Sequence, residues 1–279
     1  HGLSEARIGQ NLRWRPRKEF VVSTKVGRVL KPALRKDIDF KPWVDGLPFK
    51  SVYDYSYDGT MRSFEDSLQR LGLEYIDILF IHDADVFTHG PELQKVYFKQ
   101  AMDGCYRALT KLRDEGAVKA IGFGVNDVAV MIDFMRQGDF DALLLAGRYT
   151  LLEQEPLDEL LPLCEKRNTA VVIGGGFNGG ILATGAVPGA KWNYAPAPDP
   201  IMKKVAKIEL ICAKHKVPLP AAALQFLLAV PSVASHVPGT RNVAQMEQNI
   251  ALVSHPIPAA FWQELKQQEL IRGDAPVPR

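Results

Sequence analysis

The segment that most constrains the fold is Tyr75–Asp85, which reads YIDILFIHDAD. Its run of Ile, Leu and Phe is too short for a buried helix. A continuous apolar run of this length is typical of a strand covered on both faces, as in a parallel sheet flanked by helices. We therefore expect His82 at the carboxyl end of a strand, where parallel α/β proteins gather their functional loops. A lone histidine there is often only a core residue, so its partners decide its role.

Composition argues against several classes of protein. The chain has 279 residues, of which 47% are hydrophobic and 24% charged, and its net charge is +2. The weak charge and the absence of a long basic run predict no nucleic-acid binding. No apolar run reaches the roughly 18 residues of a membrane span, so no membrane partner is expected. The separated cysteines Cys105, Cys164 and Cys212 favour a reducing compartment, and we expect a cytoplasmic protein with no metal site.

Strand-like and helix-like segments alternate along the chain. The predicted strands are Phe20–Lys25, the run ending at His82, Val118–Val125, Ala142–Ala146, Ala170–Ile173 and Val233–Val237. Each is followed by a predicted helix, which indicates an open doubly wound sheet or an eightfold barrel. We expect an α/β fold with six units of a (β/α)8 barrel in a single domain, residues 1–279. The first two strands would precede His1, so the domain would be incomplete at the N-terminus.

Two consecutive predicted strands end in residues that could carry chemistry. Lys25 and His82 would point into the same mouth of a barrel. A strand-end lysine is usually just solvated. Beside a histidine and a cofactor, however, its positive charge can lower the pKa of an acid/base group.

Glycine-rich loops follow the last two predicted strands. Gly174, Gly176 and Gly179 match G-x-G-x-x-G, but we predict no helix in 181–200, which argues against a Rossmann site. Pro238–Asn242, PGTRN, precedes a helix whose backbone amides would favour an anion. Together the two loops predict a phosphate-bearing cofactor.

In this order, the segments resemble the aldo-keto reductase family. The similar stretches are HGLSE at 1–5, VVSTKVG at 21–27, ILFIHDAD at 78–85 and VPGTRNVAQMEQNIA at 237–251. The stretches at 53–77, 144–154 and 174–182 are similar to the branch of D-threo-aldose 1-dehydrogenases, with pyridoxal 4-dehydrogenases as near relatives. The resemblance implies a TIM barrel and hydride transfer between a nicotinamide cofactor and a carbonyl or alcohol.

The resemblance also implies site residues. Lys25 and His82 match the catalytic lysine and histidine, whereas the catalytic Asp and Tyr of the family would fall upstream of His1. Ala146 replaces a family glutamine, and Phe177 or Tyr149 could stack on the nicotinamide. The implied cofactor-binding residues are Asn126, Gly175, Phe177, Asn178, Gly180, Gly239, Thr240, Arg241, Gln245 and Asn249.

The implied cofactor is NAD, with NADP as the alternative. Family members that prefer NADP carry a lysine and an arginine where this chain has Gly239 and Gln245. The expected partner is a small-molecule substrate, an aldose or similar polyol, for which Trp43 and Trp192 could supply stacking surfaces. The alternatives are oxidation of an aromatic alcohol, as in pyridoxal 4-dehydrogenases, and a non-catalytic cofactor-binding relative. The sequence indicates no oligomeric state.

Overall fold

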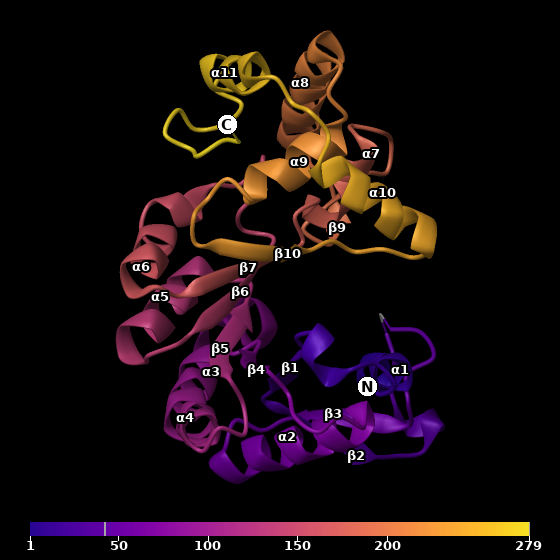
Figure 1. Ribbon diagram of the computed structural model, residues 1–279, viewed down its shortest axis with the longest axis vertical. Coiled ribbons are helices and arrows are strands. Elements are labelled where there is room, and N and C mark those ends of the chain that lie inside the picture. Colours follow the sequence, from indigo (N-terminus) through magenta and orange to yellow (C-terminus); the bar gives the residue numbers. More distant parts are fainter. Residues whose placement is uncertain (42, 279) are drawn as a thin grey trace. The chain divides into compact units, whose positions relative to one another are not determined.

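The computed structural model describes residues 1–41 and 43–278 (Figure 1). The chain divides into two compact units, His1–Leu143 and Leu144–Arg279. Unit 1 contains α1 (Leu3–Leu12), β1 (Ser23–Val26), β2 (Arg28–Pro32), β3 (Phe49–Tyr53), α2 (Tyr57–Leu71), β4 (Ile78–His82), α3 (Val86–Gln100), a π-helix (Ala101–Tyr106), α4 (Arg107–Asp114), β5 (Ala120–Val125) and α5 (Val128–Gln137). Unit 2 contains α6 (Leu160–Arg167), β7 (Ala170–Gly174), α7 (Ile181–Thr184), β8 (Lys191–Trp192), β9 (Ala195–Pro196), α8 (Asp199–His215), α9 (Leu219–Leu227), β10 (Val233–Val237), α10 (Val243–Val253) and α11 (Ala259–Gln267). The division falls within β6 (Ala142–Ala146), and short 3₁₀ turns lie at Arg17–Glu19, Arg35–Asp37, Glu155–Leu157 and Asn178–Gly180.

Parallel strands form the sheet of unit 1, in the order β1-β4-β5-β6. β1 pairs with β4 and β4 pairs with β5, both in parallel. Leu79, Phe80 and Ile81 are almost completely buried, as expected for a strand covered on both faces. The expectation that His82 ends a buried parallel strand is therefore confirmed.

Local signals set the ends of α2. The Ser56 hydroxyl accepts a hydrogen bond from the Gly59 amide, and Gly72 ends the helix in a left-handed conformation with φ 60°. Small and apolar residues spaced three or four apart, from Gly59 to Leu71, are buried, so one side of α2 packs on β1 and β2 (Figure 1). This packing supports the strand that carries Lys25.

The lack of periodicity between Val26 and Asp58 predicts a long loop before α2, and this prediction is wrong. Residues 28–53 contain an antiparallel hairpin in which Arg28 pairs with Tyr53 and Pro32 with Phe49. A second difference is that α3 begins at Val86, whereas the amphipathic pattern of the sequence predicts a helix only over Lys95–Glu115. Asp85 caps its first turn by accepting from the Thr88 amide at 2.9 Å, and the helix passes a kink at Gly90.

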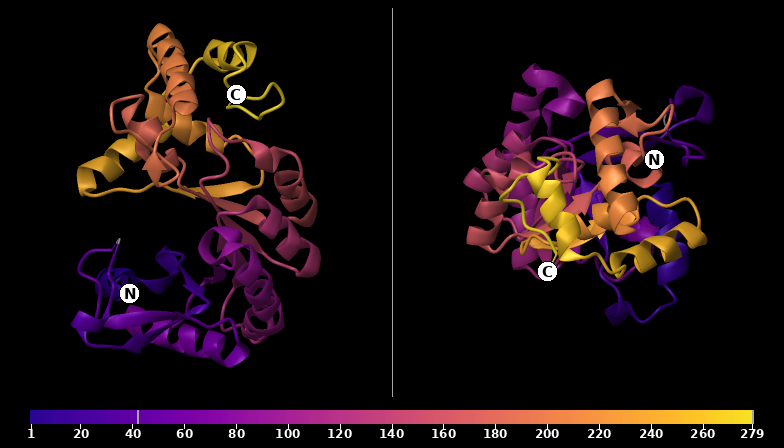
Figure 2. Two further views of the ribbon diagram at one scale, coloured as in Figure 1. Left: turned by 180° about the vertical axis from the view of Figure 1, so that it is seen from behind. Right: turned by 90° about the horizontal axis from the view of Figure 1, so that it is seen from above.

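Unit 2 has the strand order β6-β7-β10, and β10 pairs with β7 in parallel. α6 packs on β7 and α9 packs on β10. Its core includes Tyr149 stacked on Phe226, with ring centroids 5.3 Å apart, and the fully buried Trp262. α8 and α11 lie side by side in both views of Figure 2. These elements place the loops after β7 and β10 at one end of the strands.

Two small elements of unit 2 were missed in the sequence. Residues 181–184 form the one-turn helix α7 directly after Gly180, although we predicted no helix between Ile181 and Pro200. The Pro-rich loop 186–200 contains the two-residue hairpin β8–β9. Both elements are too short to leave a periodic pattern in the sequence.

Within the described residues the parallel sheet has six strands, and helices alternate with them as the barrel prediction requires. The single-domain extent and the missing N-terminal strands stay predictions. Among the residues described, no helix combines the length and apolar character needed to cross a membrane. The three cysteines are free and buried.

Candidate active site

The two predicted catalytic residues come together at the strand ends of unit 1. Lys25 lies opposite Phe80 in the pairing of β1 with β4, and His82 ends β4 opposite Gly124 of β5. Side chains two residues apart on a strand share one face, so Lys25 and His82 project on the same side of the sheet. The sequence prediction of a shared location agrees with this register.

The surroundings keep His82 uncharged. Burial, together with the positive charges of Arg28 and Lys25, lowers the pKa of His82 to about 2. Desolvation by the surrounding protein atoms lowers the pKa of Lys25 as well, and the charge of Asp83 opposes this shift. The residue nevertheless remains exposed to solvent. A neutral imidazole can hydrogen-bond a substrate oxygen as donor or acceptor without changing its charge near neutral pH.

Asp83 and Arg28 form an ion pair beside these two residues, which the sequence analysis did not anticipate. Asp83 follows His82 with φ 53°, in the left-handed region, and its Oδ1 lies 3.3 Å from Nε2 of His82. Burial raises the pKa of Asp83 to about 6, and Arg28 opposes that rise. The Arg28 guanidinium also lies over the ring of Tyr53, 4.9 Å from its centroid. A charged pair therefore borders His82 on the side of the β2–β3 hairpin.

Asp85 joins the ends of β4 and β5. This carboxylate is fully buried and accepts from the backbone amides of Thr88 and Asn126, at 2.9 and 2.8 Å. Asn126, predicted to bind the cofactor, is thereby held at the end of β5. Asp83 and Asp85 closely follow a histidine that ends a strand, and this position is the sequence signal that could have identified them. The alternation of strands and helices alone does not identify them.

In unit 2, the two glycine-rich loops line a single pocket of about 640 Å³. Eight of the predicted cofactor residues border it: Gly175, Phe177, Gly180, Gly239, Thr240, Arg241, Gln245 and Asn249. The remaining lining residues are Gly176, Gly179, Ala183, Thr184, Pro220, Gln248 and Leu252. The sequence prediction that these loops converge therefore agrees with the arrangement in unit 2.

The chemistry of this pocket fits a phosphate-bearing cofactor. A side chain built on Gly180 or Gly239 would meet no atom within 4 Å, so a ligand can approach the backbone there. The described lining residues include the cation Arg241 and carry no carboxylate. Asn242 caps α10 by accepting from the Gln245 amide at 2.9 Å, and the Gln245 side chain accepts from the Arg241 amide at 2.8 Å.

Asn178 is the predicted cofactor residue of unit 2 that does not line this pocket. It is 1% exposed, and its Nδ2 donates to Glu153 at 3.0 Å. Asn193 donates to the same carboxylate at 3.1 Å, and Arg148 does so at 3.3 Å. Glu153, which we did not predict, thus ties the glycine loop to the loop that carries Trp192.

The predicted aromatic residues lie in different surroundings. Phe177 lines the unit 2 pocket, whereas Tyr149 is 0% exposed and packs on Phe226. Trp43 of unit 1 is 64% exposed. Trp192 is partly buried, and its Nε1 has no hydrogen-bond partner within the described part of the chain. Stacking by Phe177 is compatible with its position, and substrate contacts of both tryptophans stay predictions.

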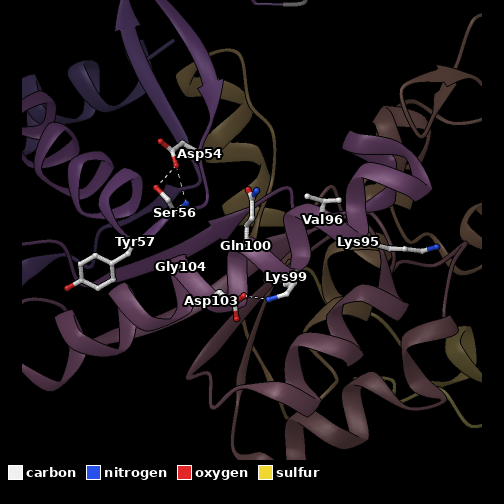
Figure 3. A pocket seen from close by; sticks show the side chains of 9 residues that line it. All are labelled: Asp54, Ser56, Tyr57, Lys95, Val96, Lys99, Gln100, Asp103 and Gly104. Carbon is white, nitrogen blue, oxygen red and sulfur yellow. Dashed lines mark hydrogen bonds and ion pairs between the residues drawn. The ribbon is translucent and has the colours of Figure 1, made fainter.

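A larger pocket, about 770 Å³, lies elsewhere in unit 1 (Figure 3). It is bordered by Asp54, Ser56, Tyr57, Lys95, Val96, Lys99, Gln100, Asp103 and Gly104. None of these is a predicted site residue, and the visible polar contacts, Ser56 to Asp54 and Lys99 to Asp103, are internal to the pocket wall (Figure 3). Its volume exceeds that of the unit 2 pocket, although its described lining includes neither Lys25 nor His82. In the described residues, no three His, Cys, Asp or Glu side chains are grouped as metal ligands.

Comparison with known proteins gives consistent matches. The model of the aldo/keto reductase family matches residues 1–269. The chain is 42% identical to a pyridoxal 4-dehydrogenase of Microbacterium luteolum and 39% identical to a D-threo-aldose 1-dehydrogenase of a Pseudomonas species. Each alignment covers 97% of this chain, with 82% and 81% of the respective relatives. Among solved structures, an aldo-keto reductase of Bacillus halodurans in its holo form superposes with a TM-score of 0.73 at 22% identity, covering 100% of this chain and 80% of that one.

Proposed function

The chain belongs to the aldo/keto reductase family, and we propose that it transfers hydride between NAD and the carbonyl or alcohol carbon of an aldose. The observation that carries this proposal is the placement of Lys25 and His82 on one face at neighbouring strand ends. The unit 2 pocket supports it with two glycine-rich loops suited to a cofactor phosphate.

The residues have separate tasks in this proposal. When bound, the nicotinamide cofactor supplies or accepts the hydride. His82, neutral because its pKa is lowered, orients the substrate oxygen through a hydrogen bond. Lys25 supplies a positive charge, which stabilises negative charge on the acid/base group that exchanges a proton with the substrate oxygen. The backbone amides of the two glycine-rich loops hold the phosphates.

The substrate class rests on the relatives and on an exposed aromatic side chain of unit 1. One relative is named for an aldose, and the exposed Trp43 offers a flat surface on which the apolar face of a sugar can stack. A second candidate is an aromatic alcohol of the pyridoxal type. It is favoured by the other relative and by the aromatic group of Tyr53, His89 and Tyr97, whose rings lie 4.3 to 6.2 Å apart.

Steady-state kinetics with L-fucose and with pyridoxal, each with NAD, test the proposal. We expect a higher kcat/KM for L-fucose and loss of both activities in Lys25→Met. A higher kcat/KM for pyridoxal would replace the aldose by the aromatic substrate. Absence of turnover for both, with intact NAD binding, would favour a non-catalytic cofactor-binding relative.

We also propose a cytoplasmic location. Cys105, Cys164 and Cys212 are free, and burial raises the pKa of each thiol to about 12. Such thiols are inert side chains of the core, which fits a reducing compartment. Fractionation of cells with detection of the protein tests this location.

A further inference from the structure

Tyr55 is a buried tyrosine whose hydroxyl lies at the backbone of the candidate catalytic histidine. The residue is 0% exposed, and its hydroxyl donates to the His82 carbonyl at 2.8 Å. The same hydroxyl lies 3.1 Å from Nε2 of His89. Because a phenol carries one proton, the oxygen that donates to His82 accepts from His89. The hydroxyl therefore links the His89 ring to the His82 backbone through two hydrogen bonds.

The backbone around Tyr55 is itself fixed on two sides. The Asp54 amide donates to Gly27 at 3.0 Å, and the Cys105 amide donates to the Tyr55 carbonyl at 3.1 Å. A side chain on Gly104 would come within 2.2 Å of that carbonyl oxygen, so the π-helix approaches Tyr55 as closely as backbone allows. π-helical turns within α-helices are frequent at functional sites. The phenol is thus anchored by rigid elements.

Gly27 lets the tyrosine ring reach the end of β1 as well. This glycine follows the Lys25 strand with φ 103°, and a side chain there would lie 2.6 Å from the Tyr55 ring and 3.4 Å from the His82 carbonyl. The ring therefore fills the space between the ends of β1 and β4. One side chain contacts both strands that carry the candidate catalytic residues.

The bond from Tyr55 also acts at a strained point of the backbone. Asp83, directly after His82, adopts the left-handed conformation, which is unfavourable for most residues that carry a side chain. Such a conformation persists when neighbouring contacts hold it. Burial lowers the pKa of His89, while the charge of Asp85 opposes this shift. The single N–H of a neutral His89 ring is therefore available to donate to the Tyr55 hydroxyl next to this strained turn.

We propose that Tyr55, supported by His89, is a positioning residue that holds the end of β4 and so sets the direction of the His82 imidazole. Tyr55 does not reach the reacting atoms in this proposal, and it acts only through the His82 backbone. The inference rests on the proposed function, in which His82 orients the substrate oxygen. It goes further by naming the residue on which that orientation depends.

The test compares Tyr55→Phe with Tyr57→Phe in the full chain. The first substitution keeps the ring against Gly27 and removes only the hydroxyl. The second removes a hydroxyl two residues away, in the wall of the separate 770 Å³ pocket (Figure 3). Four quantities are measured: kcat, KM, NAD affinity by fluorescence quenching, and the NMR signals of the His82 ring. His89→Gln, which keeps a side-chain donor, serves as a conservative third variant.

We expect Tyr55→Phe to lower kcat about tenfold, the effect of one lost hydrogen bond, and to shift the ring signals of His82. KM and NAD affinity should stay within about twofold, and Tyr57→Phe should match the parent protein. His89→Gln should lower kcat less than Tyr55→Phe does. Unchanged kcat and unchanged His82 signals in Tyr55→Phe would overturn the proposal. A joint fall in kcat, NAD affinity and thermal midpoint would also overturn it, because it would indicate a general structural role. If the parent protein turns over no substrate, the proposed function fails, and the His82 signals still decide the positioning role.

Discussion

Lys25 stands opposite Phe80 in the parallel register of β1 and β4, so its ammonium shares a face of the sheet with His82 two residues further along. The two groups are coupled electrostatically, because the charge of Lys25 is one of the causes that lower the pKa of His82. In the proposed function, the lysine therefore stabilises negative charge on the acid/base group, and the neutral histidine orients the substrate oxygen.

Replacing Lys25 with Met should reduce kcat by about a hundredfold or more, because general acid/base catalysis typically contributes factors of this size. The affinity for NAD should change less than about threefold, since the residues that line the proposed cofactor pocket come from 175–252. Single-turnover rates and NAD titrations measure the two effects separately. Lys50→Met, at an exposed position of β3, is the matched control. Equal losses in rate and NAD affinity would make Lys25 a binding residue.

Asp83 should make the stability of the protein fall as pH rises from about 4 to 6. Burial raises its folded-state pKa from 3.8 to about 6, so the folded state holds the proton more tightly than the unfolded state. The side chain is 15% exposed, and a shift of this size corresponds to at most about 3 kcal/mol of stability, lost as the carboxyl ionises.

The measurement is the free energy of unfolding of the parent protein minus that of Asp83→Asn, followed from pH 4 to pH 7. This difference should decrease with rising pH, because the asparagine variant has no charge to bury. Other carboxylates, such as Asp77 with its lowered pKa, contribute the opposite trend in both proteins and cancel. A difference that increases with pH would mean that Arg28 stabilises the Asp83 charge more than burial opposes it.

The sequence located the parallel strands because burial on both faces leaves an uninterrupted apolar run, as in Ile78–His82. It did not reveal the β2–β3 hairpin, since Lys31, Pro32 and Lys50 interrupt the apolar alternation and the strands are sixteen residues apart along the chain. The helix start at Val86 was missed because Gly90 and Pro91 normally indicate a break, whereas the structure continues through a kink there.

For the candidate site, the sequence predicted residues that end strands and loops, and missed residues that depend on long-range contacts. Lys25 and His82 lie at the ends of recognisable strands, and each glycine loop follows such a strand. Tyr55 and Glu153 act through partners 27 and 25 residues away, His82 and Asn178, and no local pattern encodes such pairs. Only the folded backbone brings these groups within hydrogen-bonding distance.

Glu153→Gln should weaken NAD binding about tenfold without changing the lining of the pocket. The carboxylate accepts from Asn178 and Asn193, and a neutral amide cannot accept equally well from both. Asn178 has φ 47°, a left-handed conformation that the bond to Glu153 helps to hold. NAD titration by fluorescence quenching measures the effect, with Glu165→Gln on the exposed side of α6 as control. Equal affinity in both variants would show that the glycine loop keeps its shape without Glu153.

The choice between NAD and NADP should depend on the charge of the loop after β10. We expect a higher kcat/KM with NAD, since the loop after β10 has Gly239 where NADP-preferring relatives of the family are expected to carry a lysine. Arg241 is exposed and borders the same pocket, and it is the cation that could reach a 2′-phosphate. Arg241→Ala should therefore change kcat/KM for NAD by less than about threefold. A preference for NADP that disappears in Arg241→Ala would overturn the prediction and identify the responsible residue.

A variant designed to gain affinity for NADP tests the same argument. A side chain on Gly239 meets no atom within 4 Å, and the residue does not have a positive φ, so lysine fits without strain. One charge-assisted hydrogen bond to the 2′-phosphate is worth about 1.5–3 kcal/mol, so Gly239→Lys should tighten NADP binding roughly tenfold or more and leave NAD binding nearly unchanged. Gly273→Lys, at another glycine with open space, controls for added positive charge alone. If both lysine variants tighten NADP equally, the gain comes from overall charge, and the phosphate does not lie at Gly239.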